Sequence, residues 1–288
     1  MKAVFKHELN TYFTGILGYI FGVFLLIFAG LYTTAYNIRG TYANFEYVLS
    51  GMTLIFVIIV PIITMRILAE EKHLKTDQLL YSLPLNMTKV VCGKFFALLV
   101  VYAIPMAVIC IYPLILSAFG NVSLPTAYGA IVGFFLLGAA LISIGMFISS
   151  MTESQGVAAG VCFVVMLLNY FLNSIVNFIS TDAFASLIAF TVVIVIVALI
   201  IYLMIKDSFI SFMIGFIAEV ILILFYVFSN SSFESLFPNV MGNLSLFERF
   251  YTFADGVFDI TGVIYFVSII VLFLFLSIQS MEKRRWSE

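Results

Sequence analysis

Residues 61–95 read PIITMRILAEEKHLKTDQLLYSLPLNMTKVVCGKF, the stretch with the densest charge in the chain. Five of its charged residues fall within ten positions, namely Arg66, Glu70, Glu71, Lys72 and Lys75. On either side the sequence lacks charge entirely, over residues 47–65 and 95–152. An apolar run of about 20 residues is long enough to cross a bilayer as a helix. The stretch is therefore predicted to be a polar connection between two membrane spans.

The composition of the whole chain leads to the same class of protein. Of its 288 residues 64% are hydrophobic, and only 10% are charged (13 basic and 15 acidic), against about 25% in an ordinary globular domain. So few charges cannot cover the surface of a soluble protein of this length. The composition excludes a cytosolic enzyme, a nucleic-acid binder and a disulfide-stapled secreted domain, and predicts an all-α integral membrane protein.

The apolar segments predict about eight transmembrane helices within a single transmembrane domain, residues 1–288. The candidate spans are 15–36, 47–68, 92–117, 127–149, 157–179, 184–205, 208–229 and 257–279. The polar breaks between the apolar runs are shortest in the region 157–230. An alternative is therefore six spans plus an inserted or re-entrant hairpin. Three GxxxG patterns, which allow close helix approach, start at Gly18, Gly129 and Gly156.

The basic residues orient these spans. Eleven of the 13 fall on the side that holds the N-terminus: Lys2, Lys6, Arg66, Lys72, Lys75, Lys89, Lys94, Lys206, Lys283, Arg284 and Arg285. The other side has only Arg39 and Arg249. Because cytoplasmic loops are enriched in Lys and Arg, we expect both termini to be cytoplasmic.

Three segments outside the spans have distinct patterns. Residues 1–13 are predicted to form an interfacial helix, with Phe5, Leu9, Tyr12 and Phe13 toward lipid and Lys2, Lys6 and Glu8 opposite. Residues 69–91 form a cytoplasmic segment. Residues 230–256 are interpreted as an external amphipathic segment whose aromatic side chains lie on the outer membrane surface.

The cytoplasmic segment is predicted to continue the second span as a polar helix. Glu71 and Lys75 have the i, i+4 spacing of a favourable ion pair, and Pro84 would end the helix. Residue chemistry alone leaves two interpretations open: an amphipathic connector on the membrane, or a helix that docks a cytoplasmic partner.

No sequence pattern supports catalysis, cofactor binding or metal binding. The chain lacks the phosphate-binding pattern GxxxxGK[ST] as well as HExxH and GxSxG. Its two histidines are far apart, and its three cysteines have no metal-ligand spacing. We therefore expect no catalytic, cofactor-binding or metal-ligating residue.

Polar side chains inside the predicted spans are the other candidates. Glu219 lies in the middle of the seventh span, where a carboxylate must be protonated, paired or beside a wet cavity. Asn169, Asn173 and Asn177 recur at i, i+4 and i+8 and give the fifth span one polar face. Both features fit either a translocation path or a dimer axis, or hydrogen bonds that only pack helices together.

The run 61–95 resembles the signature after the second span of ABC-2 type (type-2 ABC) transporter permease subunits. Within that family it is most similar to the gliding-motility-associated and nitrous-oxide-reductase-maturation branch. The residues that match are Pro61, Thr64, Met65, Arg66, Ala69, Glu70, Glu71, Thr76, Gln78, Leu80, Pro84, Gly93 and Lys94. Lys75 stands where that pattern has glycine. The C-terminal run from Leu244 to Trp286 also resembles this branch.

This resemblance implies a permease subunit of a bacterial plasma-membrane ABC transporter that exports a substrate. Two permease copies or paralogues would pair, and each would dock a cytoplasmic ATP-binding cassette subunit that hydrolyses the ATP. Coupling to that ATPase would involve Arg66, Glu70, Glu71, Lys72, Thr76 and Gln78. Two alternatives remain: a secondary transporter, which only Glu219 favours, and a non-transporting membrane anchor or mechanotransmission subunit for an ATPase.

Overall fold

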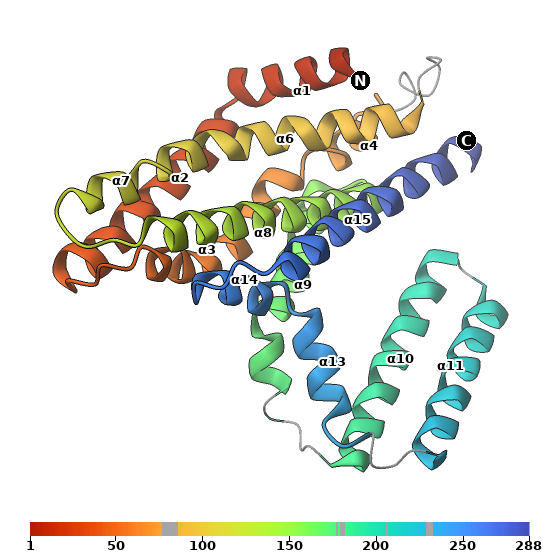
Figure 1. Ribbon diagram of the computed structural model, residues 1–288. Coiled ribbons are helices and arrows are strands. Elements are labelled where there is room, and N and C mark those ends of the chain that lie inside the picture. The colour runs from red at the N-terminus through yellow and green to blue at the C-terminus, as the bar shows by residue number, and fades with distance from the viewer. Residues whose placement is uncertain (77–85, 177, 179–181, 206, 229–232, 288) are drawn as a thin grey trace. The chain divides into compact units, whose positions relative to one another are not determined.

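The computed structural model describes residues 1–76, 86–176, 178, 182–205, 207–228 and 233–287. These residues form helices and short connections, and this part of the chain has no strand (Figure 1). The contacts divide the chain into two compact units. The first combines Met1–Tyr170 with Arg249–Glu288, and the second is Phe171–Glu248.

The first unit contains most of the helices. In chain order they are α1 (Lys2–Thr14), α2 (Ile16–Thr33), the π-helix η1 (Thr34–Arg39), α3 (Glu46–Thr64), α4 (Ala69–His73), α6 (Met87–Ile109), α7 (Tyr112–Ser117), α8 (Leu124–Met151) and α15 (Ile260–Ser287). The second unit contains α10 (Ala183–Ile205), α11 (Ser208–Phe228) and α13 (Leu236–Leu244). Two helices, α9 (Gln155–Val176) and α14 (Leu246–Ala254), have residues in both units.

Seven helical segments in the described residues are long and apolar enough to cross a membrane. They are Ile16–Arg39, Glu46–His73, Met87–Ser117, Leu124–Met151, Gln155–Val176, Ser211–Phe228 and Ile260–Arg284. These segments confirm the all-α membrane fold. The predicted span 184–205 coincides with α10, in which Ala183–Leu199 is a shorter apolar stretch. Helices α10 and α11 form the hairpin that the sequence predicted in this region (Figure 1).

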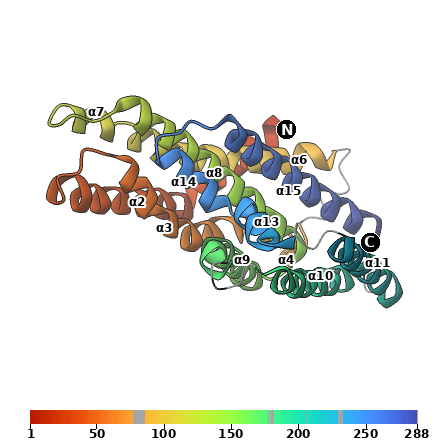
Figure 2. The ribbon, with the colours of Figure 1, turned by 60° about the horizontal axis from the view of Figure 1, so that its bottom comes forward.

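Helix α8 is the centre of the first unit. It packs against α15, α3 and α6 (Figures 1 and 2), and nearly all its residues from Gly133 to Ser150 are buried. Two glycines make this packing possible. A Cβ atom at Gly145 would lie 2.8 Å from Thr64 Cβ on α3, and one at Gly138 would touch the Tyr102 ring on α6. Both glycines lie outside the three GxxxG patterns.

Aromatic side chains fill the core around α8. The Phe134 ring lies 4.5 Å from Phe56 and 5.6 Å from Phe250, centroid to centroid. Tyr102 is fully buried and donates a hydrogen bond from its hydroxyl to the Phe134 carbonyl at 2.8 Å. That bond matters because a hydroxyl without a partner is costly in an apolar interior.

The segment predicted to lie on the outer membrane surface has aromatic side chains that pack inside the protein. Its described residues 233–254 include α13 and α14, and five phenylalanine side chains of this segment are buried within the protein, namely Phe233, Phe237, Phe247, Phe250 and Phe253. In the first unit Phe250 and Phe253 are fully buried, and Phe253 occupies the space beside Gly133 and Gly262. The aromatic residues contribute to the core because such rings bury a large apolar area. Residues 230–232 lie outside the described part.

The second unit has a small aromatic core of its own. Phe233 is fully buried and contacts the rings of Phe190, Phe225 and Tyr226. Phe190 also packs edge-on against Phe237 of α13 at 5.1 Å. This cluster joins α10, α11 and α13 at one end of the hairpin.

The close approach at Gly145 yields a stability prediction. We expect Gly145→Ala to lower the free energy of unfolding by about 1–3 kcal/mol, the usual cost of overpacking, because Thr64 is β-branched and fully buried. Gly156→Ala is the matched control, since no described atom lies within 4 Å of a Cβ there. Unfolding midpoints in detergent compare the two, and an equal effect of both substitutions would contradict the assignment.

Candidate functional site

The second span ends in an interruption rather than in a continuous polar helix. Helix α3 ends at Thr64, residues 65–68 form turns, and α4 follows with only five residues. Ser149 of α8 satisfies the backbone at this break. Its Oγ accepts hydrogen bonds from the N–H groups of Leu68 (3.2 Å) and Ala69 (3.0 Å) and donates one to the Met65 carbonyl (3.1 Å). The prediction of one continuous helix after the second span was therefore wrong.

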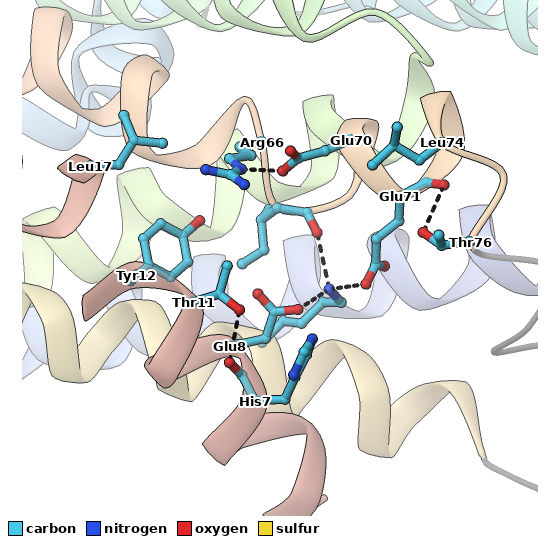
Figure 3. Close-up of a pocket in the computed structure, with 12 residues that line it drawn as sticks. His7, Glu8, Thr11, Tyr12, Leu17, Arg66, Glu70, Glu71, Leu74 and Thr76 are labelled. Atoms are coloured by element: carbon cyan, nitrogen blue, oxygen red, sulfur yellow. Dashed lines mark hydrogen bonds and ion pairs between the residues drawn. The ribbon is translucent and has the colours of Figure 1, made fainter. Parts of the chain in front are cut away.

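Lys94 of α6 is the electrostatic centre of this region. Its side chain is 2% exposed, and its Nζ donates to Glu8 Oε1 at 2.5 Å, Glu71 Oε1 at 2.7 Å and the Ile67 carbonyl at 3.1 Å (Figure 3). An ammonium group has three donors, and each has an acceptor here. Lys94 therefore joins the N-terminal helix α1, the interruption and α4 to the third span.

A pocket of about 380 Å³ lies beside this ion pair. Arg66 and Glu70, four residues apart, form an ion pair at its edge, with about one third and one quarter of their side chains exposed (Figure 3). Tyr12 of α1 also lines the pocket and donates from its hydroxyl to the Ile63 carbonyl at 3.0 Å. Burial, and secondarily the charge of Glu8, raise the pKa of Tyr12 well above its ordinary value, so this hydroxyl remains a donor.

The Lys72 side chain points to α8, whereas those of Glu70 and Glu71 line the pocket. It is 5% exposed, and its Nζ donates to the Ser150 carbonyl near the C-terminal end of α8. Ser280 Oγ of α15 donates to the same carbonyl at 3.0 Å. A cation at a helix C-terminus interacts favourably with the helix dipole. Lys72 therefore attaches α4 to α8.

The residues after α4 are exposed and turn sharply. His73, Leu74, Lys75 and Thr76 are all exposed, with Leu74 at 61%. Lys75 has φ = +55°, a left-handed conformation that glycine adopts without steric cost. It cannot form the predicted helical pair with Glu71, and Glu71 pairs with Lys94 instead.

The predicted coupling residues thus fall into three groups. Arg66, Glu70, Glu71 and Thr76 line one pocket, whereas Lys72 points to α8. Gln78 lies outside the described residues. The sequence also predicted that Glu8 lies on the polar face of the interfacial helix. In the structure Glu8 is buried, with 8% of its surface exposed. A lysine within an apolar span, Lys94, was the available signal that a carboxylate must be buried nearby.

The predicted intramembrane residues have separate partners. Thr191 Oγ1 lies 2.8 Å from Glu219 Oε1, between α10 and α11. Asn173 Nδ2 donates to Glu248 Oε2 at 3.0 Å. Asn169 is half-buried, and Asn177 lies outside the described residues.

The spans, the interrupted second span and its polar pocket define a polytopic membrane protein with a structured connection after the second span. Comparison with protein families gives a match to "ABC-2 family transporter protein" over residues 31–188, more than half of the chain. The chain therefore belongs to the ABC-2 transporter family and is the membrane permease of an ABC transporter, a non-catalytic transmembrane subunit. Comparisons with curated proteins and with solved structures found no match.

Removal of the buried cation tests the role of Lys94. We expect Lys94→Met to lower the free energy of unfolding by about 3–5 kcal/mol, because it leaves carboxylates buried without their cation. Lys89→Met, at an exposed position of the same helix, should change it by less than about 0.5 kcal/mol. Adding Glu8→Gln and Glu71→Gln to Lys94→Met should restore part of the loss. Equal denaturation midpoints for Lys94→Met and Lys89→Met would refute this interpretation.

The conformation of Lys75 leads to an independent prediction. Lys75→Gly should raise the free energy of unfolding by about 1 kcal/mol, because a left-handed conformation costs an L-residue about that much. Lys75→Ala, which keeps the Cβ atom, should leave stability nearly unchanged. Chemical denaturation of the three proteins measures the difference, and a gain in the alanine variant equal to that in the glycine variant would speak against strain at this residue.

Proposed function

We propose that this permease exports a substrate with energy from ATP hydrolysed by a separate cytoplasmic ATP-binding subunit. Family membership implies an ATP-hydrolysing partner in general, and the chain itself has no phosphate-binding motif. The observation that carries the proposal is the exposed turn after α4. Buried ion pairs of Lys94 with Glu71 and Glu8 hold the helix that precedes this turn. Membership of this family favours ATP-driven transport over ion-coupled secondary transport.

The docking surface in this proposal is the partly exposed pair Arg66 and Glu70 together with exposed Leu74 and Thr76. Leu74 supplies an apolar contact, and apolar anchors with polar neighbours are typical of protein interfaces. Gln78 continues the same segment in sequence and is proposed to contribute. Glu71 and Lys72 act on the inner side, where they hold α4 to Lys94 and to α8.

Ion pairs would transmit movement from this surface into the membrane. When the ATP-binding subunits close, α4 is displaced, and the Lys94 contacts carry α1 and α6 along with it. Packed helices respond to such a displacement by rigid-body rotation. A single cation that contacts three segments suits this role better than separate surface ion pairs, which are individually weak.

The translocation path is proposed to involve the polar groups of the later spans. Asn169, Asn173 and Asn177 would face a second permease copy or the substrate path, and Glu219 would face the path or pack helices. The bond from Asn173 to Glu248 supports a packing role for Asn173.

The finer assignments rest on sequence resemblance. We propose that the protein belongs to the gliding-motility-associated and nitrous-oxide-reductase-maturation branch, is located in a bacterial plasma membrane with both termini cytoplasmic, and works as a homo- or heterodimer. The matching residues after the second span and near the C-terminus support this proposal.

Co-purification tests the docking surface. The double variant Glu70→Lys, Leu74→Glu should reduce recovery of the ATP-binding subunit with the tagged permease by about tenfold or more, since loss of an interface anchor costs more than about 1.4 kcal/mol. Asp255→Ala is the control, because Asp255 is exposed and precedes the start of α15, whereas it is Ser280, near the other end of that helix, that contacts the Ser150 carbonyl beside Lys72. If the double variant retains normal amounts of the ATP-binding subunit, this surface is not the docking site.

A further inference from the structure

Glu219 is the only charged residue in helices α10, α11 and α13 of the second unit. Helices α10, α11 and α13 contain no Lys, Arg, His or Asp and no other Glu. The single basic residue in the sequence of this unit is Lys206, which precedes α11. Glu219 lies eleven residues after the start of that helix, at a distance of about 16 Å for a rise of 1.5 Å per residue. It also lies outside the region 31–188 that matches the family.

The contact between α10 and α11 is close at this depth. Gly215, one turn before Glu219, would place a Cβ atom 3.1 Å from Ala198 Cβ. This small pair lets the two helices approach, and the same approach brings Thr191 of α10 against the carboxyl group of Glu219. The other titratable groups of the two helices, Tyr202 and Tyr226, lie toward the helix ends. No charged group of α10 or α11 therefore faces Glu219.

The hydrogen bonds around Thr191 indicate whether the Glu219 carboxyl group carries a proton. Thr191 Oγ1 lies 3.1 Å from the Leu187 carbonyl and 2.8 Å from Glu219 Oε1. A hydroxyl has one proton to donate, so it cannot fully satisfy both acceptors. A neutral carboxylic acid resolves this: the Glu219 O–H donates to Thr191 Oγ1, and the Thr191 O–H donates to the Leu187 carbonyl. Both short contacts are then hydrogen bonds.

We propose that Glu219 is a proton-binding site within the membrane-spanning hairpin. The bound proton makes the carboxyl neutral, completes the chain of hydrogen bonds from α11 to the α10 backbone, and removes a charge that no cation of these helices balances. Loss of the proton would leave a carboxylate in an apolar environment and would turn the Thr191 hydroxyl toward it. Packing of α10 on α11 is thereby linked to proton binding.

The site is within reach of reagents dissolved in the bilayer. Glu219 is half-buried, and adjacent side chains of α11 are apolar and exposed, among them Ile217 and Ile221. Dicyclohexylcarbodiimide is lipid-soluble and reacts with protonated carboxyl groups. The acid proton goes to one nitrogen of the carbodiimide and the carboxyl oxygen bonds to its central carbon; acyl transfer to nitrogen then gives a stable N-acylurea with no leaving group.

Labelling of the full-length permease in lipid vesicles tests the proposal. We expect one equivalent of dicyclohexylcarbodiimide to add at Glu219, as located by peptide mass spectrometry, and the yield to fall as the pH is raised. Glu219→Gln should abolish this adduct. Glu8 is an internal control that should not react, because its carboxyl group is buried and paired with Lys94. A water-soluble carbodiimide, applied to the same vesicles, should leave Glu219 unmodified.

Infrared difference spectra of the same vesicles give a second measurement. The C=O stretching band of a protonated carboxylic acid should be present in the wild type and lost in Glu219→Gln. It should shift in Thr191→Val, in which the acid loses its acceptor but the side chain keeps its shape. Absence of the adduct and of the band from acidic to neutral pH would overturn the proposal. Neither measurement requires the ATP-binding subunit, so its outcome does not depend on the proposed docking surface.

Discussion

The ammonium group of Lys94 is the constraint on which the end of the first unit that contains α4 depends. A buried charge is tolerated only where it is paired and its hydrogen bonds are complete. Glu8, Glu71 and the Ile67 carbonyl meet that requirement, and they come from α1, α4 and the turn between α3 and α4. Satisfying one lysine therefore fixes the positions of three segments that are far apart in sequence.

The interruption of the second span follows from the same rule applied to the backbone. Ending α3 at Thr64 frees peptide groups that an apolar environment would leave without partners. Ser149 supplies both a donor and an acceptor at this point, and Lys72 occupies the end of α8 next to it. These contacts hold the turn of residues 65–68 and helix α4 against α8.

The spans could be predicted from the sequence because the length of an apolar run is a local property. The Lys94 ion pair could not, because Glu8 lies 86 residues away and sequence spacing gives no information on such a contact. Local spacing was misleading for Glu71, whose expected partner Lys75 takes a left-handed conformation. The GxxxG patterns were only a partial guide: Gly133 packs against Phe253, but Gly156 has no described neighbour within 4 Å of a Cβ, and Gly145, which packs against Thr64, lies outside the patterns.

The two units deal with buried carboxyl groups in opposite ways. Glu8 and Glu71 share the Lys94 cation, so the energetic cost of their burial is offset by attraction to it. Glu219 has a threonine hydroxyl as its partner and no basic residue in α10, α11 or α13, so in our proposal a bound proton takes the place of a basic partner. The first unit thus holds its helices together through opposite charges, whereas the hairpin does so through hydrogen bonds.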